Sequence, residues 1–190
     1  MHEITWFMNL IITGNPGVGK HTIANEIMKI GDYDLLDINE AAFESKNTEN
    51  NELNIEVDVE NLKKYLKNKI SKKSLIVGHL APYVASKSDI DLVIVLRKNP
   101  YKLAEIYEQR GYSNEKIKEN IESEILGIIT HDSLSEFGRE KTFQIDVTAK
   151  TTKQTLEKIQ IIIKEQNHND EVDWLSEIYQ NDDLRKFFDY

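Results

Sequence analysis

The chain contains no cysteine, so it has no disulfide and no zinc site built on thiolates. It also has no apolar run of the about 20 residues that a membrane-spanning helix requires, and its first residues do not follow a signal-peptide pattern. Aspartate and glutamate number 33 against 24 lysines and arginines, and the net charge of −9 argues against a broad basic surface for nucleic acid. These features predict a cytoplasmic protein that makes no contact with membranes.

Arginine is scarce, with only Arg97, Arg110, Arg139 and Arg185 in the whole chain. An arginine binds phosphate through a planar guanidinium with two prongs, whereas a lysine offers a compact, strongly hydrated charge. Any chemistry that needs several arginines must therefore use these positions. The acidic balance suits a basic partner, or a phosphate whose charge is masked by a metal ion.

Short apolar runs alternate with stretches of helical periodicity along the chain. The expected strands cover residues 7–13, 33–37, 75–77, 92–96 and 143–147. The expected helices cover residues 20–30, 38–44, 59–70, 100–110, 115–133 and 151–163, and residues 45–54 are expected to form a loop. This alternation predicts an α/β fold with a doubly wound, five-stranded parallel sheet. We expect one domain over residues 1–166, and a tail over residues 167–190 whose apolar side chains dock on that domain.

A glycine-rich segment, GNPGVGK from Gly14 to Lys20, follows the first expected strand directly. It fits the first seven positions of the phosphate-binding loop G-x-x-x-x-G-K-[ST]. Glycines let successive backbone N–H groups turn toward phosphate oxygens, and the lysine reaches the β- and γ-phosphates. The following helix adds the positive end of its dipole. The segment therefore predicts a nucleotide-phosphate site, against the simpler interpretation of a strand-to-helix turn without a ligand.

The eighth position of the motif departs from the usual pattern. It holds His21 where most such loops have serine or threonine, and the hydroxyl comes one residue later, at Thr22. Two interpretations of His21 stay open: a helix residue that faces solvent, or a residue that contacts phosphate through its backbone N–H.

Further motifs follow the loop in a fixed order. The segment from Asp91 to Glu124, DLVIVLRKNPYKLAEIYEQRGYSNEKIKENIESE, resembles the adenylate kinase isoenzyme 6 family. The resemblance is carried by Leu96-Arg97, Arg110-Gly111-Tyr112, Lys116-Ile117, Asn120-Ile121 and Glu124, and by Gly78-His79 after the third expected strand. It covers residues 10–164 and leaves the tail outside.

The resemblance implies a P-loop NTPase fold with a short lid at residues 109–119 and a region for the nucleoside monophosphate at residues 37–59. It implies ATP and Mg²⁺ at the site, with the γ-phosphoryl group transferred to AMP or to water. It further implies a role in maturation of the small ribosomal subunit. The implied partners there are a basic ribosomal protein of the subunit platform and the pre-ribosome itself.

Functional positions of that family can be carried over onto matching residues of this chain. The phosphate contacts fall on Gly17, Gly19, Lys20, His21 and Thr22, with Thr22 as the metal ligand. Arg110 matches the lid arginine that stabilises the transferred phosphoryl group, and Lys150 matches a position against the adenine. We expect Lys20, His79 and Arg110 to act in catalysis, with His79 orienting a water or polarising the γ-phosphate. The competing interpretations are a helix-capping arginine at Arg110 and a hydrogen-bonded loop histidine at His79.

Two positions depart from the family pattern. Val77 replaces an acid that would help to hold magnesium, and Phe43 replaces an arginine of the monophosphate helix. Asp37 and Asp58 are candidates for a compensating metal or ribose contact. Because positioning supplies most of the catalysis in phosphoryl transfer, we expect slow phosphorylation of AMP, with water competing as acceptor. Two alternatives remain: a nucleotide-gated assembly chaperone with vestigial catalysis, and a kinase of another small metabolite.

Overall fold

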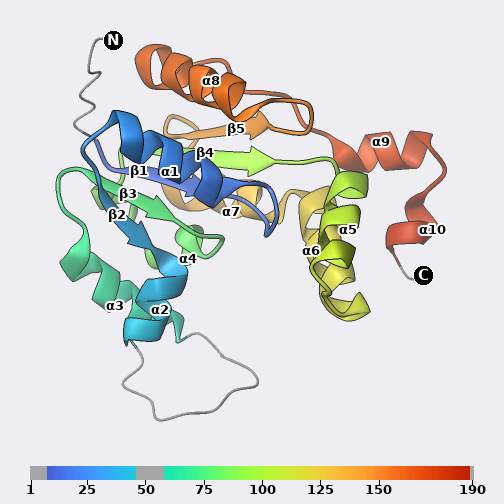
Figure 1. Ribbon diagram of the computed structural model, residues 1–190, viewed down its shortest axis with the longest axis horizontal. Coiled ribbons are helices and arrows are strands. Elements are labelled where there is room, and N and C mark those ends of the chain that lie inside the picture. The colour runs from blue at the N-terminus through green and yellow to red at the C-terminus, as the bar shows by residue number, and fades with distance from the viewer. Residues whose placement is uncertain (1–7, 46–57, 189–190) are drawn as a thin grey trace.

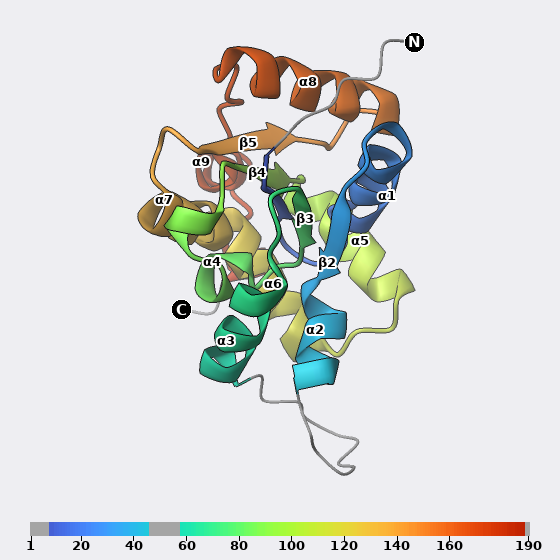
Figure 2. The ribbon, with the colours of Figure 1, turned by 90° about the vertical axis from the view of Figure 1, so that its left-hand side faces the viewer.

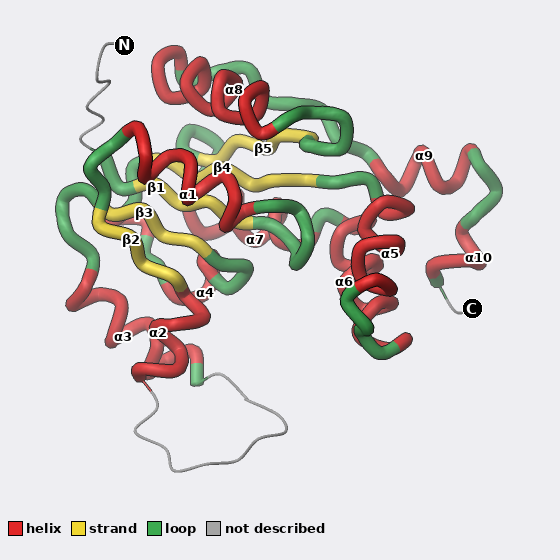
Figure 3. The backbone as a smooth tube through the Cα atoms, in the orientation of Figure 1, coloured by secondary structure: helices red, strands yellow, loops and turns green. Residues whose placement is uncertain are grey.

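The computed structural model describes residues 8–45 and 58–188 (Figure 1). Five parallel strands form one sheet in the order β2-β3-β1-β4-β5 (Figure 3). The strands are β1 (Leu10–Thr13), β2 (Asp34–Asp37), β3 (Ser74–Val77), β4 (Leu92–Arg97) and β5 (Thr142–Asp146). The doubly wound, five-stranded parallel sheet predicted from the sequence is therefore confirmed.

Helices cover both faces of this sheet (Figure 2). In the first half of the chain they are α1 (Lys20–Ile30), α2 (Ile38–Ser45), α3 (Val59–Lys69), α4 (Ala81–Val84) and the 3-10 turn η1 (Lys87–Asp89). In the second half they are α5 (Pro100–Gln109), α6 (Asn114–Leu126), α7 (Ile128–Phe137), α8 (Thr152–Glu165), α9 (Trp174–Gln180) and α10 (Leu184–Phe187). Within the described ranges, none of these helices has the length and apolar character needed to span a bilayer.

Each face of the sheet has its own apolar core, because successive side chains of a strand point to opposite faces. Leu10 and Ile12 of β1 pack with α1, α5, α6 and α8 on one face. Ile11 packs with α2, α3, α4 and α7 on the other. All four residues of β1 are fully buried, as is typical of a parallel strand covered on both sides.

The central position of β1 determines where a ligand can bind. From β1 the chain passes to β2 and β3 on one side of the sheet and later to β4 and β5 on the other. The carboxyl ends of the strands therefore leave a crevice beside the segment that follows β1. Residues 14–19 occupy this place and lead into α1.

Two glycines allow the backbone to approach closely at this edge. A Cβ atom on Gly14 would lie 2.3 Å from the carbonyl oxygen of Leu96, and one on Gly78 would lie 2.6 Å from the Cβ of Ile38. Both residues also have positive φ angles, of 135° and 157°. The ends of β1 and β3 can thus meet their neighbours only with glycine at these two positions.

Some elements differ from those predicted. The single helix expected over residues 115–133 is two helices, α6 and α7, because Gly127 adopts a left-handed conformation with φ of 65° and ends the first. The sequence reasoning missed α4 and η1. The first strand starts at Leu10 in the structure, while residue 7, where it was expected to start, and most of the loop expected at residues 45–54 lie outside the described residues.

The residues after α8 return to the sheet and then to α6. The N–H of Asp170 donates to the carbonyl of Gln144 in β5, and the N–H of Gln144 donates to the side-chain oxygen of Asn169. This contact covers the open edge of β5. Beyond it, α9 lies against α6, and Ile178 and Phe187 are buried in the same apolar core as β1 (Figure 1).

The glycine between α6 and α7 provides a test of the fold. We expect Gly127→Ala to lower the free energy of unfolding by about 2 kcal/mol, since a left-handed alanine alone costs about 1–2 kcal/mol. The added methyl group would also lie 3.3 Å from the Nη1 atom of Arg97, so the guanidinium would have to shift by a few tenths of an ångström. Chemical denaturation of the purified protein measures this change.

Gly111→Ala is the matched control for this substitution. Gly111 has almost the same φ angle, 68°, but a Cβ atom there would have no neighbour within 4 Å. We expect it to lower the free energy of unfolding by only about 1 kcal/mol, from backbone strain alone. Equal losses in the two variants would show that the contact with Arg97 is unimportant.

Candidate functional site

A cavity of about 480 Å³ lies at the carboxyl edge of the sheet, beside the glycine-rich loop. One side is formed by the loop and the first turn of α1, with Pro16, Gly17, Gly19, Lys20, His21 and Thr22. The other side is formed by Asn39, His79, Arg110, Tyr112, Lys116 and Asn120. Seven of the eight residues that sequence reasoning assigned to the site line this cavity, and Lys150 does not. No lining residue among those described is acidic.

The loop presents backbone N–H groups to the cavity. Gly17 and Gly19 have φ angles of 83° and 98°, a conformation that brings successive N–H groups to the inside of a turn. Gly19 is also the N-cap of α1, and no side chain caps this helix end. Since the first N–H groups of a helix have no partner within the helix, this end suits an anion.

Lys20 is the cation at the centre of the loop, and its side chain is almost completely buried. Its ammonium group donates to the carbonyl oxygen of Asn15 at 3.2 Å. Burial, and then the nearby charge of Arg110, lower the pKa of Lys20 to about 8, although Asp37 partly offsets the effect. An incoming phosphate would favour the charged form of the ammonium.

His21 connects the start of α1 to the end of β2. Its Nε2 atom lies 2.8 Å from Oδ2 of Asp37, whose other oxygen accepts the backbone N–H of Asn39 at 2.8 Å. The His21 side chain is partly exposed and lines the cavity. Its contact with Asp37 also holds a carboxylate beside the loop. The sequence interpretations of His21 did not include this contact.

His79 follows β3 and faces the same cavity from the opposite side. Burial lowers the pKa of this histidine from its usual value of 6.5, and the charges of Lys20 and Lys116 lower it further. The imidazole is therefore neutral at pH 7. A neutral imidazole has one nitrogen that can accept a proton or a hydrogen bond from water.

Arg110, which the sequence places in the expected lid, lines the cavity. Arg110 is the C-cap residue of α5. It is exposed and is followed by Gly111, which adopts a left-handed conformation. Tyr112 stacks on Tyr107 of α5 with ring centroids 5.4 Å apart. The Tyr107 hydroxyl donates to the carbonyl of Pro16 at 2.6 Å, so α5 is bonded to the phosphate loop.

Sequence reasoning missed Lys116 as a site residue. It lies in the first turn of α6, lines the cavity, and places its ammonium 4.4 Å from the ring centroid of Tyr112. A first-turn lysine is unfavourable because it faces the positive end of the helix dipole. That anomaly is the signal in the sequence that could have identified it. Asn39, Tyr112 and Asn120 were missed as well, and they carry no comparable signal.

Arg97, one of the residues that carry the family resemblance, does not line the cavity. Its side chain is 5% exposed, and its Nε atom donates to Oε1 of Glu124 at 2.7 Å. Arg110 is therefore the one arginine of the four that lines the cavity. The amide of Asn120 donates to the carbonyl of Lys116.

The remaining positions singled out in the sequence lie outside the cavity lining. The Lys150 ammonium donates to the carbonyl of Asp146 at 2.7 Å and lies 3.2 Å from Oδ2 of Asp170. Its contact with an adenine stays a prediction. Val77 is fully buried in β3, Phe43 is 70% exposed on α2, and Asp58 caps the start of α3.

The donor set at the cavity fits a magnesium ion that is bound together with a nucleotide. The structure shows no cluster of three or more metal-ligating side chains in the part of the chain that it describes. Mg²⁺ in such sites keeps several waters and takes only one or two protein oxygens, with phosphates supplying the rest. The hydroxyl of Thr22 lines the cavity, and the carboxylate of Asp37 lies outside the lining but close enough to Lys20 to affect its pKa; both are oxygen donors of this kind.

Known proteins similar to this chain share its fold and most of its length. Residues 10–127 match the model of a family described as an AAA domain. A protein of Thermococcus kodakarensis named "Putative adenylate kinase" is 34% identical over 90% of this chain and 95% of its own length. Proteins with the same name from Methanococcus maripaludis and Saccharolobus solfataricus are 33% and 32% identical, over 98% and 100% of their own lengths.

Solved structures support the same fold at much lower identity. The YorR protein of Bacillus subtilis, solved in complex with phosphorylated GDP, aligns with a TM-score of 0.60 at 16% identity. The alignment covers 85% of this chain and 99% of that one. Shikimate kinase of Aquifex aeolicus aligns with a TM-score of 0.53 over 84% of this chain and 98% of its own. With a parallel sheet of this order and a glycine-rich phosphate loop after its central strand, the chain has the P-loop NTPase fold and belongs to the adenylate-kinase-like family of these archaeal proteins.

Proposed function

We propose that this protein binds ATP and transfers its γ-phosphoryl group to AMP, giving two ADP, or to water. The observation that supports this most strongly is the cavity itself, in which Lys20, Arg110 and His79 meet beside the phosphate loop. We further propose that the protein is of the adenylate kinase isoenzyme 6 type and acts in the cytoplasm. The absence of cysteine agrees with a reducing compartment.

Phosphate binding follows from the groups that line the loop. The N–H groups of Gly17, Gly19 and the first turn of α1 would donate to the β- and γ-phosphate oxygens. The Lys20 ammonium would exchange its contact with the Asn15 carbonyl for one with these oxygens. Mg²⁺ held by Thr22 and Asp37 would neutralise negative charge on the phosphates.

Transfer requires a group that stabilises the charge on the moving phosphoryl group and, when water is the acceptor, a group that accepts the proton of that water. In the reaction, the bond from the γ-phosphorus to the bridging oxygen breaks as a bond to an oxygen of AMP or of water forms. Arg110 lies beside a left-handed glycine that can change its backbone angles, so its guanidinium can approach the phosphoryl group when the lid closes. When water is the acceptor, neutral His79 can accept the proton that the water loses.

The cations available for the acceptor are few. Arg97 is committed to Glu124, and Phe43 occupies the helix position where the related family carries an arginine. We therefore propose that AMP is phosphorylated slowly and that hydrolysis competes with it. The buried Arg97 also supports the second candidate, a nucleotide-gated assembly chaperone with weak catalysis. In either case we propose a basic protein of the small ribosomal subunit as partner, within the pre-ribosome, which agrees with the net charge of −9.

Loss of the loop lysine is the first test of this function. We expect Lys20→Met to weaken ADP binding about tenfold and to lower kcat/KM for ATP at least about 100-fold, because the charge on the phosphates loses its main cation. Calorimetry measures the first effect, and ADP production with and without AMP measures the second. Lys29→Met is the matched control, since Lys29 lies on the same helix but is 66% exposed and away from the cavity.

Wild-type protein that makes no more ADP than Lys20→Met, with or without AMP, would rule out the enzyme. If such a protein still bound ADP and a basic ribosomal protein of the subunit platform, the chaperone function would replace the enzymatic one. A wild type that does not bind ATP or ADP at all would rule out both.

The lid arginine makes a different prediction. Arg110→Ala should lower kcat about 100- to 1,000-fold while it changes the affinity for ADP much less, because the contact strengthens in the transition state. Arg139→Ala, which removes an exposed arginine outside the cavity lining, should leave both values unchanged. Equal changes in kcat and ADP affinity in Arg110→Ala would mean that the arginine only binds nucleotide.

The lowered pKa of Lys20 makes nucleotide affinity depend on pH. Above a pKa of about 8 the free protein loses the ammonium charge, so ADP must bind together with a proton. We expect the Kd for ADP to rise roughly tenfold from pH 7 to pH 9, and proton uptake to appear in calorimetry at pH 8.5 in buffers of different ionisation enthalpy. The Kd of Lys20→Met should stay constant over this range. A wild-type Kd that does not change with pH would contradict the assignment of this pKa.

A further inference from the structure

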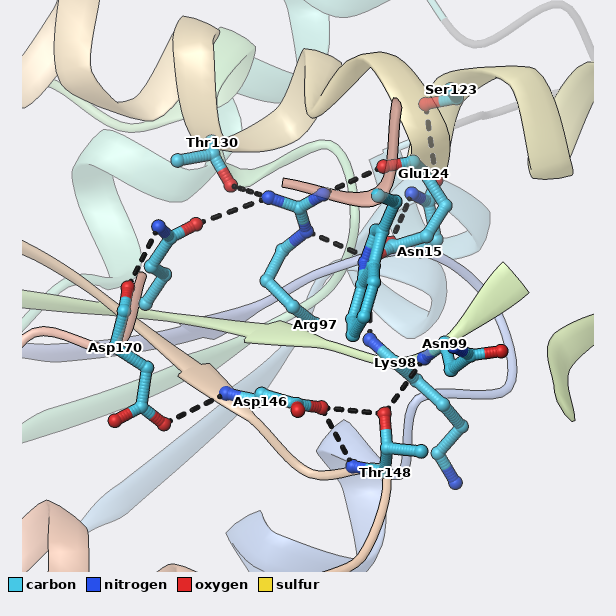
Figure 4. A network of polar contacts seen from close by, with 12 residues as sticks. Asn15, Arg97, Lys98, Asn99, Ser123, Glu124, Thr130, Asp146, Thr148 and Asp170 are labelled. Carbon is cyan, nitrogen blue, oxygen red and sulfur yellow. Dashed lines mark hydrogen bonds and ion pairs between the residues drawn. The ribbon is translucent and has the colours of Figure 1, made fainter. Parts of the chain in front are cut away.

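The carboxylate of Glu124 in α6 lies at the centre of a buried polar network outside the cavity lining (Figure 4). Its Oε1 atom accepts from Nε of Arg97 at 2.7 Å and from the backbone N–H of Lys98 at 3.2 Å. Arg97 also donates to the carbonyl of Glu124 at 2.6 Å. The glutamate is 0% exposed, so every hydrogen bond it makes must come from the protein's own groups.

One arm of this network reaches the phosphate loop. The Oε2 atom of Glu124 accepts from Nδ2 of Asn15 at 2.8 Å, and the other side-chain atom of Asn15 accepts from the hydroxyl of Ser123 at 3.2 Å (Figure 4). The backbone carbonyl of this same Asn15 accepts the ammonium of Lys20. The place of the loop lysine therefore depends on an asparagine that α6 holds through two bonds.

The other arm reaches the tail. The indole Nε1 of Trp174, the first residue of α9, donates to Oε1 of Glu124 at 3.0 Å. Trp174 is buried, and two further contacts that do not involve Glu124 hold the tail, one at Glu177 in α9 and one at Asp183 just before α10. The amide of Asn99 donates to Glu177 at 2.9 Å, and the hydroxyl of Tyr101 donates to Asp183 at 2.6 Å.

We propose that Trp174 and Glu124 are positioning residues for the phosphate loop, so that docking of α9 and binding of nucleotide phosphates strengthen each other. The inference rests on the proposed function, since it needs a nucleotide in the loop. A carboxylate that accepts from both arms transmits a change in one to the other. When the indole N–H is lost, the charge of Glu124 is shared among fewer donors and Asn15 is pulled from its place.

Coupling of this kind is reciprocal by thermodynamic necessity. If a docked α9 raises the affinity for ADP, then ADP must raise the stability of docked α9 by the same factor. A tail that only fills space over α6 would show neither effect. The two directions can be measured separately.

The first experiment compares two substitutions that each remove one hydrogen-bond donor between the tail region and the domain. Trp174→Phe keeps an aromatic ring but removes the donor to Glu124, whereas Tyr101→Phe removes the donor to Asp183 and leaves Glu124 untouched. We expect Trp174→Phe to weaken ADP binding about fivefold or more and Tyr101→Phe to leave it unchanged. Equal effects of the two variants on the Kd would overturn the proposal.

The second experiment measures the reverse direction in protein without a binding-site mutation. The chain has two tryptophans, so Trp6→Phe leaves Trp174 as the only one. Trp174 does not line the cavity, yet we expect its fluorescence to change on addition of ADP and to saturate at the Kd found by calorimetry. We also expect ADP to slow hydrogen exchange of α9 about fivefold in the wild type and much less in Trp174→Phe.

The outcomes separate this inference from the proposed function. A wild type that binds ADP while the fluorescence and the exchange of α9 stay unchanged would overturn the coupling alone. A wild type that does not bind ADP would overturn the coupling together with the nucleotide site.

Discussion

The buried ion pair between Arg97 and Glu124 constrains the whole carboxyl edge of the sheet, because neither charge can be left without partners in the interior. Arg97 ends β4 and Glu124 belongs to α6, so the pair joins the sheet to this helix. Its remaining bonds extend to Asn15 in the phosphate loop and to Trp174 in the tail. Breaking one member of such a pair typically costs about 3–5 kcal/mol. Arg97 therefore holds β4 to α6 and does not reach the cavity.

The cavity is lined by positively charged side chains, although the chain as a whole carries a negative net charge. The chain carries a net charge of −9, yet three cationic side chains line the cavity: Lys20, Arg110 and Lys116. Concentrating few cations in one crevice attracts a polyphosphate locally while the outer surface repels it. Burial of the Lys20 ammonium disfavours its charged form and lowers its pKa. A phosphate bound beside it would favour the charged form again.

Local patterns in the sequence were sufficient to predict the sheet and the phosphate loop. Continuous apolar runs identify buried parallel strands, and the spacing from Gly14 to Lys20 reflects backbone angles that only glycine adopts easily. The break at Gly127 was missed because helical periodicity continues on both sides of it. The roles of Arg97 and Lys116 depend on partners far along the chain or across the lid, which a linear pattern does not contain. Sequence patterns therefore do not predict which polar groups pair over long distances along the chain.

The contact of Asn169 and Asp170 with the edge of β5 has a consequence for how the protein is made. During synthesis, residues 142–146 leave the ribosome before the segment that covers their free backbone groups, and Glu124 emerges before Trp174. For that interval a strand edge is open and a buried carboxylate lacks one donor, which are conditions that favour association with other chains. The P-loop core therefore completes its packing only after the tail has been synthesised, and until then the open edge of β5 needs protection from other chains.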